Sequence, residues 1–226
     1  MSASAIRIEG LSFARAGGGF AIGVPELEVA KGERLALVGP SGSGKTTLLM
    51  LIAGILQPAA GRVLVEGTDL TALSDARRRQ LRARRVGFVF QSFELVDYLS
   101  ARDNILYPYR ISPGLRLDAQ VRARAQALAA ASGLGAVLDR RPERLSQGER
   151  QRVGICRALL TRPGLVLADE ATGNLDPDNK ARLLDLMFDR AAEAGAAVIA
   201  ATHDHGLLPR FDRVIDIAAF RAERAA

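Results

Sequence analysis

The residues from Gly39 to Thr47 have the types and the spacing that surround phosphate groups in proteins. The first eight match the pattern G-x-x-x-x-G-K-[ST], whose glycines let the backbone curl so that its N–H groups point at phosphate oxygens. The positive end of the following helix faces the same phosphates, Lys45 neutralises the β and γ phosphates, and the Thr46 hydroxyl is expected to bind Mg²⁺. We therefore predict that ATP and magnesium bind here, at Gly39, Pro40, Ser41, Gly42, Ser43, Gly44, Lys45, Thr46 and Thr47. A flexible turn is the alternative, and it does not explain why the motif lies between a predicted strand and a predicted helix.

Two adjacent carboxylates follow a buried strand later in the chain. Residues 165–168 are all apolar, as expected for a parallel strand that is covered on both faces, and Asp169 and Glu170 come at its carboxyl end. Ligands gather at the carboxyl ends of strands in open α/β sheets. We therefore expect Asp169 to hold the magnesium ion and Glu170 to act as the general base on the attacking water. The alternative, a strand that ends in solvated acids, is weak once a phosphate loop precedes it.

The segment Leu145 to Glu149, with the sequence Leu-Ser-Gln-Gly-Glu, has two compatible interpretations. Ser146 and Glu149 have the spacing of a capping box, which predicts that a helix begins at residue 147. The same helix start, with its Ser hydroxyl and the backbone of Gly148, is also an anion site. Capping and anion binding can coexist.

Six elements in this order and approximate spacing resemble the ABC ATPases, over about residues 5 to 217. They are the phosphate loop, Gln91 (similar to the Q-loop), the Leu145–Glu149 segment (similar to the signature motif, usually LSGGQ), the Asp169–Glu170 pair, residues 174–176 (similar to the D-loop) and His203 (similar to the switch histidine). Together these motifs are highly specific. The resemblance implies an α/β fold of the P-loop NTPase (RecA-like) type, with a mostly parallel sheet, an antiparallel β subdomain and a helical insert.

The resemblance also implies roles for individual residues. Two copies of the chain pair head to tail, and each ATP lies between the phosphate loop of one copy and the signature of the other. Ser146 and Gly148 then contact the γ-phosphate in trans, and Asp176 couples the two sites. Gln91 touches magnesium and the lytic water and relays the nucleotide state to a membrane subunit. His203 holds the γ-phosphate and orients the general base; its alternative is a satisfied histidine at a strand end.

Several positions depart from the family pattern. Gln147 and Glu149 replace the usual Gly and Gln of the signature, but Glu149 keeps the capping role, so we expect an active site. Arg15 stands where the family often stacks an aromatic side chain on adenine. Its guanidinium plane is able to stack instead, with weaker nucleotide affinity and looser base selectivity as the expected result. Phe13 falls on the core-facing alternation, and Phe20 lies beyond the glycines at 17–19.

The hydrophobic pattern predicts the elements that position these residues. Strands are expected at 6–13, 20–29, 33–38, 62–65, 86–91, 165–170, 197–202 and 213–217, and helices at 45–53, 147–161 and 178–194. Strands that alternate with helices indicate a mostly parallel sheet.

The middle of the chain has a different character. Residues 101–144 are rich in Ala, Arg and Leu with helical spacing, interrupted by Pro108, Pro113 and Pro142, and we interpret them as helical. We therefore expect one ABC ATPase domain over residues 1–226. Its core covers approximately 1–91 and 146–220, the helical insert covers approximately 92–145, and a loose tail follows residue 220.

Composition narrows the class of protein further. The chain has 226 residues, of which 48% are hydrophobic, and no apolar run approaches the roughly 18 residues of a membrane span, so we expect a soluble, cytoplasmic chain. Cys156 is the single cysteine, which excludes an internal disulfide, and we interpret it as a small core residue. The arginine cluster between Arg77 and Arg85 has no interleaved aromatics, so we interpret it as a solvated helix, not a nucleic-acid surface.

We therefore interpret the chain as the ATP-hydrolysing subunit of an ABC transporter. It energises a separate integral membrane permease and lies on the inner face of the cell membrane through that partner. Residues 88–91 and 173–176 most resemble the lipoprotein-releasing, macrolide-export and cell-division ATPases, which favours export or lipoprotein release. The resemblance places the docking surface around Gln91 and residues 92–109, whose apolar side chains serve equally well as the core of the insert.

Three alternatives remain open at this point. The first is a mechanical switch that acts through a membrane partner without transport. The second is a nucleic-acid-associated ABC ATPase, although such proteins usually carry long coiled coils, zinc hooks or two ATPase domains in one chain, and we expect no nucleic acid to bind. The third, a simple phosphotransferase, leaves the signature and His203 unexplained.

Overall fold

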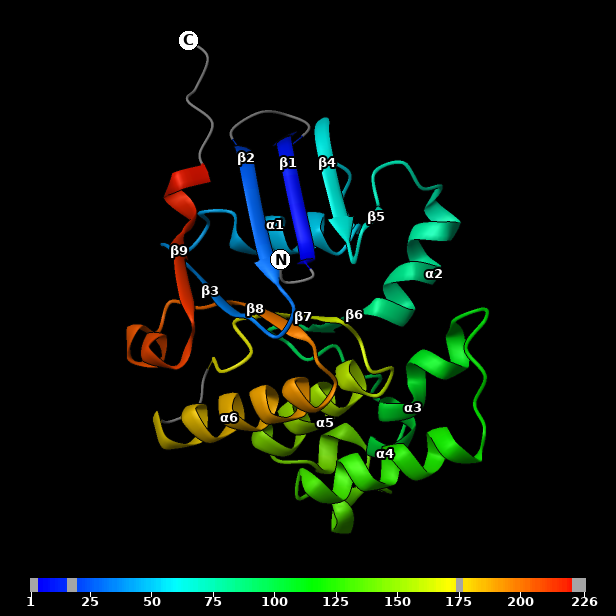
Figure 1. The fold of residues 1–226 in the computed structure, drawn as a ribbon. Coiled ribbons are helices and arrows are strands. Elements are labelled where there is room, and N and C mark those ends of the chain that lie inside the picture. Colours follow the sequence, from blue (N-terminus) through cyan, green and yellow to red (C-terminus); the bar gives the residue numbers. More distant parts are fainter. Residues whose placement is uncertain (1–3, 16–19, 174–176, 221–226) are drawn as a thin grey trace.

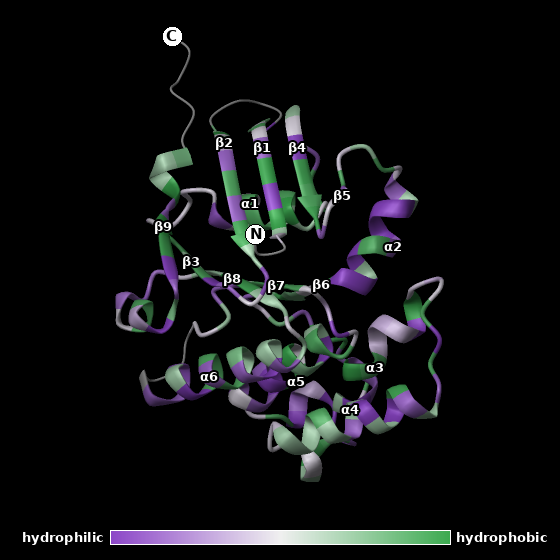
Figure 2. Ribbon diagram, in the orientation of Figure 1, coloured by the Kyte–Doolittle hydropathy of each residue, from purple (hydrophilic) through white to green (hydrophobic). Residues whose placement is uncertain are grey.

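The computed structural model describes residues 4–15, 20–173 and 177–220, and it contains two sheets. The first is antiparallel, with the order β2-β1-β4-β5. Side chains of β1 alternate between buried and exposed, which Figure 2 shows as bands of green and purple along β1 and β2. The bounds of its strands are Ser4–Ala14 (β1), Ala21–Ala30 (β2), Ala60–Val65 (β4) and Thr68–Asp69 (β5).

The second sheet is parallel, with the order β6-β7-β8-β3-β9. Every residue of β7 and β8 is buried, because helices or the other sheet cover both faces. The mostly parallel sheet and the antiparallel sheet that the sequence predicts are therefore both present. The bounds of its strands are Arg34–Val38 (β3), Val86–Val89 (β6), Leu165–Asp169 (β7), Ala197–Ala201 (β8) and Arg213–Asp216 (β9).

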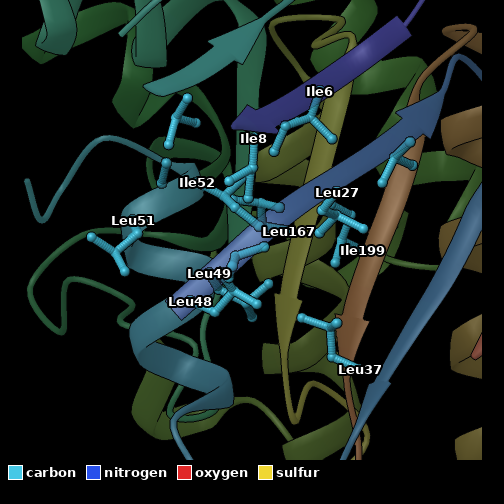
Figure 3. Packing of buried hydrophobic residues seen from close by; sticks show 14 of the residues in the cluster. Ile6, Ile8, Leu27, Leu37, Leu48, Leu49, Leu51, Ile52, Leu167 and Ile199 are labelled. Carbon is cyan, nitrogen blue, oxygen red and sulfur yellow. The ribbon is translucent and has the colours of Figure 1, made fainter. Parts of the chain in front are cut away.

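Helix α1 (Lys45–Ile52) lies between the two sheets and joins them into one core (Figure 1). Leu48, Leu49 and Ile52 are fully buried, and they belong to the same cluster as Ile6 and Ile8 of β1. Figure 3 shows these side chains converging with Leu167 and Ile199 of the parallel sheet. The core therefore fixes the start of α1 against the carboxyl end of β3, where the phosphate loop lies.

Helices cover the other face of the parallel sheet (Figure 1). Helices α5 (Gln147–Leu159) and α6 (Pro177–Glu193) pack on that face, and α3 (Ala101–Ile111) and α4 (Ala119–Ala131) pack on α5. Short 3-10 turns occur at Gly135–Val137, Pro142–Arg144, His205–Arg210 and Ile217–Phe220. Cys156 is fully buried in the cluster between α3, α4 and α5, which confirms its interpretation as a core residue.

Several predicted element boundaries are wrong. Strand β6 ends at Val89 rather than residue 91, because the chain turns there and the N–H of Phe93 donates to the carbonyl of Phe90. Strand β7 ends at Asp169 rather than residue 170, and α5 ends at Leu159 rather than residue 161. Pro108 does not interrupt the helical insert: it lies inside α3.

The arginine cluster forms helix α2 (Asp75–Arg85), as predicted, but the helix is not uniformly solvated. Arg78 is only 8% exposed, and its guanidinium donates to the carbonyl of Leu73 at 2.8 Å. Burial also lowers the pKa of Arg82. The cluster therefore attaches α2 to the core through its arginine stems.

None of the helices in the described part of the chain is long and apolar enough to cross a membrane.

Candidate active site

The phosphate loop follows β3 directly and leads into α1. Gly39, Gly42 and Gly44 have φ angles of 145°, 73° and 106°, in a region that side chains other than glycine rarely adopt. A Cβ on Gly39 would lie 2.5 Å from a side-chain carbon of Ile217, and one on Gly44 would lie 2.4 Å from the ring of Phe20. The backbone therefore favours glycine at all three positions, and lack of space also requires it at Gly39 and Gly44. The loop curls at the amino end of α1, where the helix dipole favours an anion.

Lys45 reaches back across this loop. Its Nζ donates to the carbonyls of Gly39 at 2.8 Å and Pro40 at 3.1 Å, and the residue is 5% exposed. The same nitrogen lies 3.9 Å from Oε1 of Glu170. The ammonium group therefore lies between the loop and the acidic residue.

Glu170 is the centre of the side-chain contacts in the site. Its Oε1 lies 3.4 Å from Nδ1 of His203, and its Oε2 accepts from Nε2 of Gln91 at 3.4 Å. The residue has a φ of 45°, and its N–H donates to the carbonyl of Ala201 at 3.0 Å. A left-handed residue other than glycine costs of order 1–3 kcal/mol and persists where the surroundings hold it, commonly at functional sites. The turn points the carboxylate away from the sheet and toward the loop.

Asp169 lies one residue earlier, at the buried end of β7. It is 6% exposed, and this burial raises the pKa of its carboxyl, although a hydrogen bond with the Thr46 side chain opposes the rise. A hydroxyl beside a carboxylate is a set of hard oxygen ligands that suits Mg²⁺. Within residues 4–15, 20–173 and 177–220, no group of three or more acidic, histidine or cysteine side chains could enclose a metal.

A cavity of about 360 Å³ opens above the loop. It brings together Gln91, Glu170 and most of the loop residues that the sequence predicts. Its lining consists of Arg15, Phe20, Ser41, Gly42, Ser43, Gly44, Lys45, Thr46, Thr47, Gln91 and Glu170. The residues therefore enclose a space where phosphates, a general base and a cation could meet.

Phe20 is the lining residue that the sequence reasoning missed. Its ring packs on Gly44, and its carbonyl accepts a hydrogen bond from the N–H of Arg15 at 3.1 Å, so the two residues lie side by side across the hairpin. The sequence did not predict this pairing of Arg15 and Phe20, because the number of residues after β1 does not show which residue of the next strand lies opposite. An aromatic face thus stands next to Arg15 at the mouth of the cavity. Phe13 instead packs against the core, as predicted.

The signature segment forms the predicted capping box at the start of α5. The N–H of Ser146 donates to Oε2 of Glu149 at 2.7 Å, and the N–H of Glu149 donates to Oγ of Ser146 at 3.3 Å. The first of these bonds holds the pKa of Glu149 below its usual value. Neither Ser146 nor Gly148 lines the cavity over the phosphate loop of its own chain. Asp176 lies outside the described residues.

The chain is similar to known proteins along most of its length. The sequence model of the ABC transporter family matches residues 24–173. The lipoprotein-releasing system ATP-binding protein LolD of Chromohalobacter salexigens is 46% identical over 190 residues, which are 84% of this chain and 79% of that protein. The protein of the same name in Pseudomonas fluorescens is 43% identical over 192 residues, 85% of this chain and 84% of that protein.

Solved structures agree with this relationship. A dimeric post-hydrolysis state of the ATP-binding cassette MJ0796, bound to ADP and Pi, aligns with a TM-score of 0.82 at 28% identity and covers 96% of this chain and 94% of that chain. The structure of cbiO1 from Clostridium perfringens, part of the ABC transporter complex cbiONQ, aligns with a TM-score of 0.84 at 27% identity, over 95% of this chain and 85% of that chain. The predicted P-loop NTPase fold is confirmed. The chain belongs to the ABC transporter family and is one of its ATP-binding, ATP-hydrolysing subunits.

Proposed function

We propose that this ATPase drives a separate membrane permease that releases lipoproteins. The relatives that share 42–46% of their aligned residues with the chain are named as ATP-binding proteins of a lipoprotein-releasing system. The chain itself supplies the ATPase site and, within its described residues, no membrane-crossing helix. It therefore acts on its cargo through a partner, bound on the inner face of the membrane.

At the site, the backbone N–H groups of the phosphate loop and Lys45 bind the phosphates. Thr46, Asp169 and Gln91 would hold the magnesium ion, which would neutralise charge on the phosphate oxygens when bound. Glu170 accepts the proton of the attacking water, while Gln91 and His203 hold its carboxylate in place. Positioning and electrostatics provide most of the catalysis in phosphoryl transfer, which this set of residues suits.

A second copy of the chain completes each site. Ser146 and Gly148 stand at the amino end of α5, away from the cavity of their own chain, where they are free to face an ATP held by the other copy. The solved cassette MJ0796 is described as a dimer, which supports this arrangement. The coupling of the two sites by Asp176, which lies outside the described residues, stays a prediction from the family resemblance.

An apolar groove beside Gln91 is the observation that carries the permease proposal. The groove has a volume of about 570 Å³ and lies between α2, β6, α3 and α5. Its floor contains the stacked rings of Phe88 and Phe90, whose centroids are 4.2 Å apart, and its edge carries Ile111, which is 58% exposed. Arg79 and Arg82 line the α2 side. Exposed apolar surface of this kind marks a protein interaction site, and this one adjoins a residue that contacts the general base.

The sequence left two roles open for the apolar side chains after Gln91, partner docking and packing in the core of the insert, and different side chains suit each role. Leu95 packs against the helical core, whereas Tyr98 is 74% exposed. Tyr98 is therefore available to a partner, whereas Leu95 belongs to the helical core.

The proposal is tested by capture of the partner from native cells. Glu170→Gln with ATP in mild detergent should retain a polytopic membrane protein, and Glu170→Gln combined with Ile111→Asp should lose it. Ile55→Asp is the matched control, because Ile55 is 42% exposed but does not line the groove. Recovery of nucleic acid or soluble factors without a membrane protein would contradict the proposal. Equal loss of the membrane protein with Ile111→Asp and Ile55→Asp would contradict the assignment of the groove as the docking surface.

A further inference from the structure

The turn that carries Gln91 has an uncommon backbone. Phe93 and Glu94 follow each other with φ angles of 60° and 44°, and neither is glycine. Two consecutive side chains in the left-handed region need an external contact to hold them. The turn begins with the hydrogen bond from the N–H of Phe93 to the carbonyl of Phe90, so Gln91 lies inside it.

Arg157 supplies that contact from helix α5. Its Nη1 donates to the carbonyl of Glu94 at 2.6 Å, and its Nη2 donates to the carbonyl of Phe93. The planar fork of a guanidinium is suited to two adjacent carbonyls, whereas a lysine offers one compact ammonium group. Burial lowers the pKa of Arg157, which agrees with a guanidinium held against the protein instead of in water.

The same helix has a second anchor on the catalytic side. Gln151 is fully buried, and its Nε2 donates to the carbonyls of Ala171 at 3.3 Å and Gly173 at 3.5 Å, in the loop that follows Glu170. Helix α5 begins with the signature at Ser146. It is therefore joined to the loop after the general base by one side chain and to the turn of Gln91 by another.

We propose that Arg157 is a positioning residue for ATP hydrolysis: it locks the turn that carries Gln91 to the helix that begins with the signature. A change in the position of Gln91 at the nucleotide would then move α5, and with it Ser146, as one body. Arg157 and Glu94 also line the groove, so an occupant of the groove would contact this lock directly. The inference rests on the proposed catalytic role of Gln91.

A double-mutant cycle on the purified full-length chain tests this inference. Arg157→Met keeps the apolar stem and removes both donors, and we expect it to lower kcat about tenfold or more, as Gln91→Ala does, while the ATP Kd changes less than about threefold. Because Arg157 acts through Gln91, the double variant should have a kcat within about twofold of Gln91→Ala alone. Arg157→Lys should restore part of the loss.

Arg124→Met is the matched control for the general stability of the helical part. Arg124 also donates to a carbonyl beside α5, that of Leu160 at 2.9 Å, and to the hydroxyl of Tyr109 at 2.7 Å, but not to the turn. If Arg124→Met lowers kcat, its fold loss should multiply with that of Gln91→Ala in the double variant.

Multiplicative losses for Arg157→Met and Gln91→Ala, or a wild-type kcat in Arg157→Met, would overturn the inference. If Arg157→Met does not fold, as judged by thermal unfolding, the same cycle is made with Arg157→Lys. That cycle then shows whether the losses of kcat multiply or whether the double variant equals Gln91→Ala. A wild-type kcat in Gln91→Ala would instead show that the role of Gln91 is wrong, and the inference would fail with it. The permease proposal would stand in each of these cases, because partner capture reports on it separately.

Discussion

Nδ1 of His203 lies 3.4 Å from Oε1 of Glu170, although the two residues follow different strands. Strands β7 and β8 are parallel neighbours, and Asp169 is paired with Ala201, so their carboxyl ends bring the two side chains to one edge of the sheet. Glu170 is 21% exposed and His203 is 63% exposed at the side chain, so the pair stands at the open side of the site. A histidine in this position can orient the carboxylate and also meet a phosphate.

Replacement of His203 tests this relationship. We expect His203→Ala to lower kcat by about 100-fold or more, because the carboxylate loses the group that orients it, while ATP binding stays nearly unchanged. His205 is the other histidine of the chain, and His205→Ala is the matched control because that residue is exposed and has no place in the site. Phosphate release measures both, and equal turnover in the two variants would contradict the assignment.

Asp169 is expected to lower the free energy of unfolding at neutral pH, although ATP hydrolysis requires it. Burial raises its pKa above the ordinary value of 3.8, so the folded state holds the proton more tightly than the unfolded chain does. Stability from this group is therefore fully present below 3.8 and is lost as the pH rises through the raised value. Asp169→Asn should abolish ATP hydrolysis yet increase the free energy of unfolding at pH 7, by an amount that shrinks as the pH falls. Denaturant unfolding without nucleotide measures this, and a less stable variant at pH 7 would contradict it.

Phe20 and Arg15 should differ in their effect on nucleotide affinity. Both line the cavity, but only the ring of Phe20 packs on Gly44 of the loop. A stacking contact of an aromatic ring is worth about 0.5–1.5 kcal/mol, which corresponds to about a 2- to 10-fold change in affinity. We expect Phe20→Ala to raise the Kd of ATP by this factor and Arg15→Ala to raise it less. Titration with ATP measures the Kd of both variants. A larger effect of Arg15→Ala would indicate that Arg15, not Phe20, stacks on the nucleotide base.

Comparison of two helix caps, Ser146 and Asp118, distinguishes the structural role of Ser146 from its proposed contact with nucleotide. Ser146 caps α5, and Asp118 caps α4 by accepting from the N–H of Val121 at 2.9 Å. Removal of either cap should lower the free energy of unfolding by about 1 kcal/mol. Only Ser146→Ala should weaken the ATP-dependent dimer of Glu170→Gln, because Ser146 contacts the nucleotide of the other copy. Size-exclusion chromatography with ATP measures this; an intact dimer with Ser146→Ala would remove the proposed contact in trans.

Sequence reasoning recovered the features that short-range chemistry dictates. The glycines of the loop, the apolar run before Asp169 and the capping box of Ser146 all follow from local patterns, and the structure contains each of them. The order of the motifs singled out Gln91, which the structure places beside Glu170; its predicted contacts with magnesium and the lytic water stay a prediction.

The errors occur where tertiary contacts decide the local structure. An apolar run does not reveal that Glu170 turns left-handed, because the hydrogen bond from its N–H goes to Ala201 in a neighbouring strand. The burial of Arg78 depends on the carbonyl of Leu73 in the preceding loop, a contact that has no sequence signal. The place of Phe20 depends on how the hairpin returns over Gly44. The two-residue strand β5 is too short for any periodicity to show.

Phosphate release by the purified chain, compared with that of Glu170→Gln, tests the central assignment most directly. Replacement of the carboxylate by an amide keeps the shape of the side chain and removes its ability to accept a proton. We predict that Glu170→Gln lowers turnover by about 100-fold or more while the Kd of ATP changes less than about twofold. Turnover at the wild-type rate in this variant would contradict the role of Glu170 as the general base.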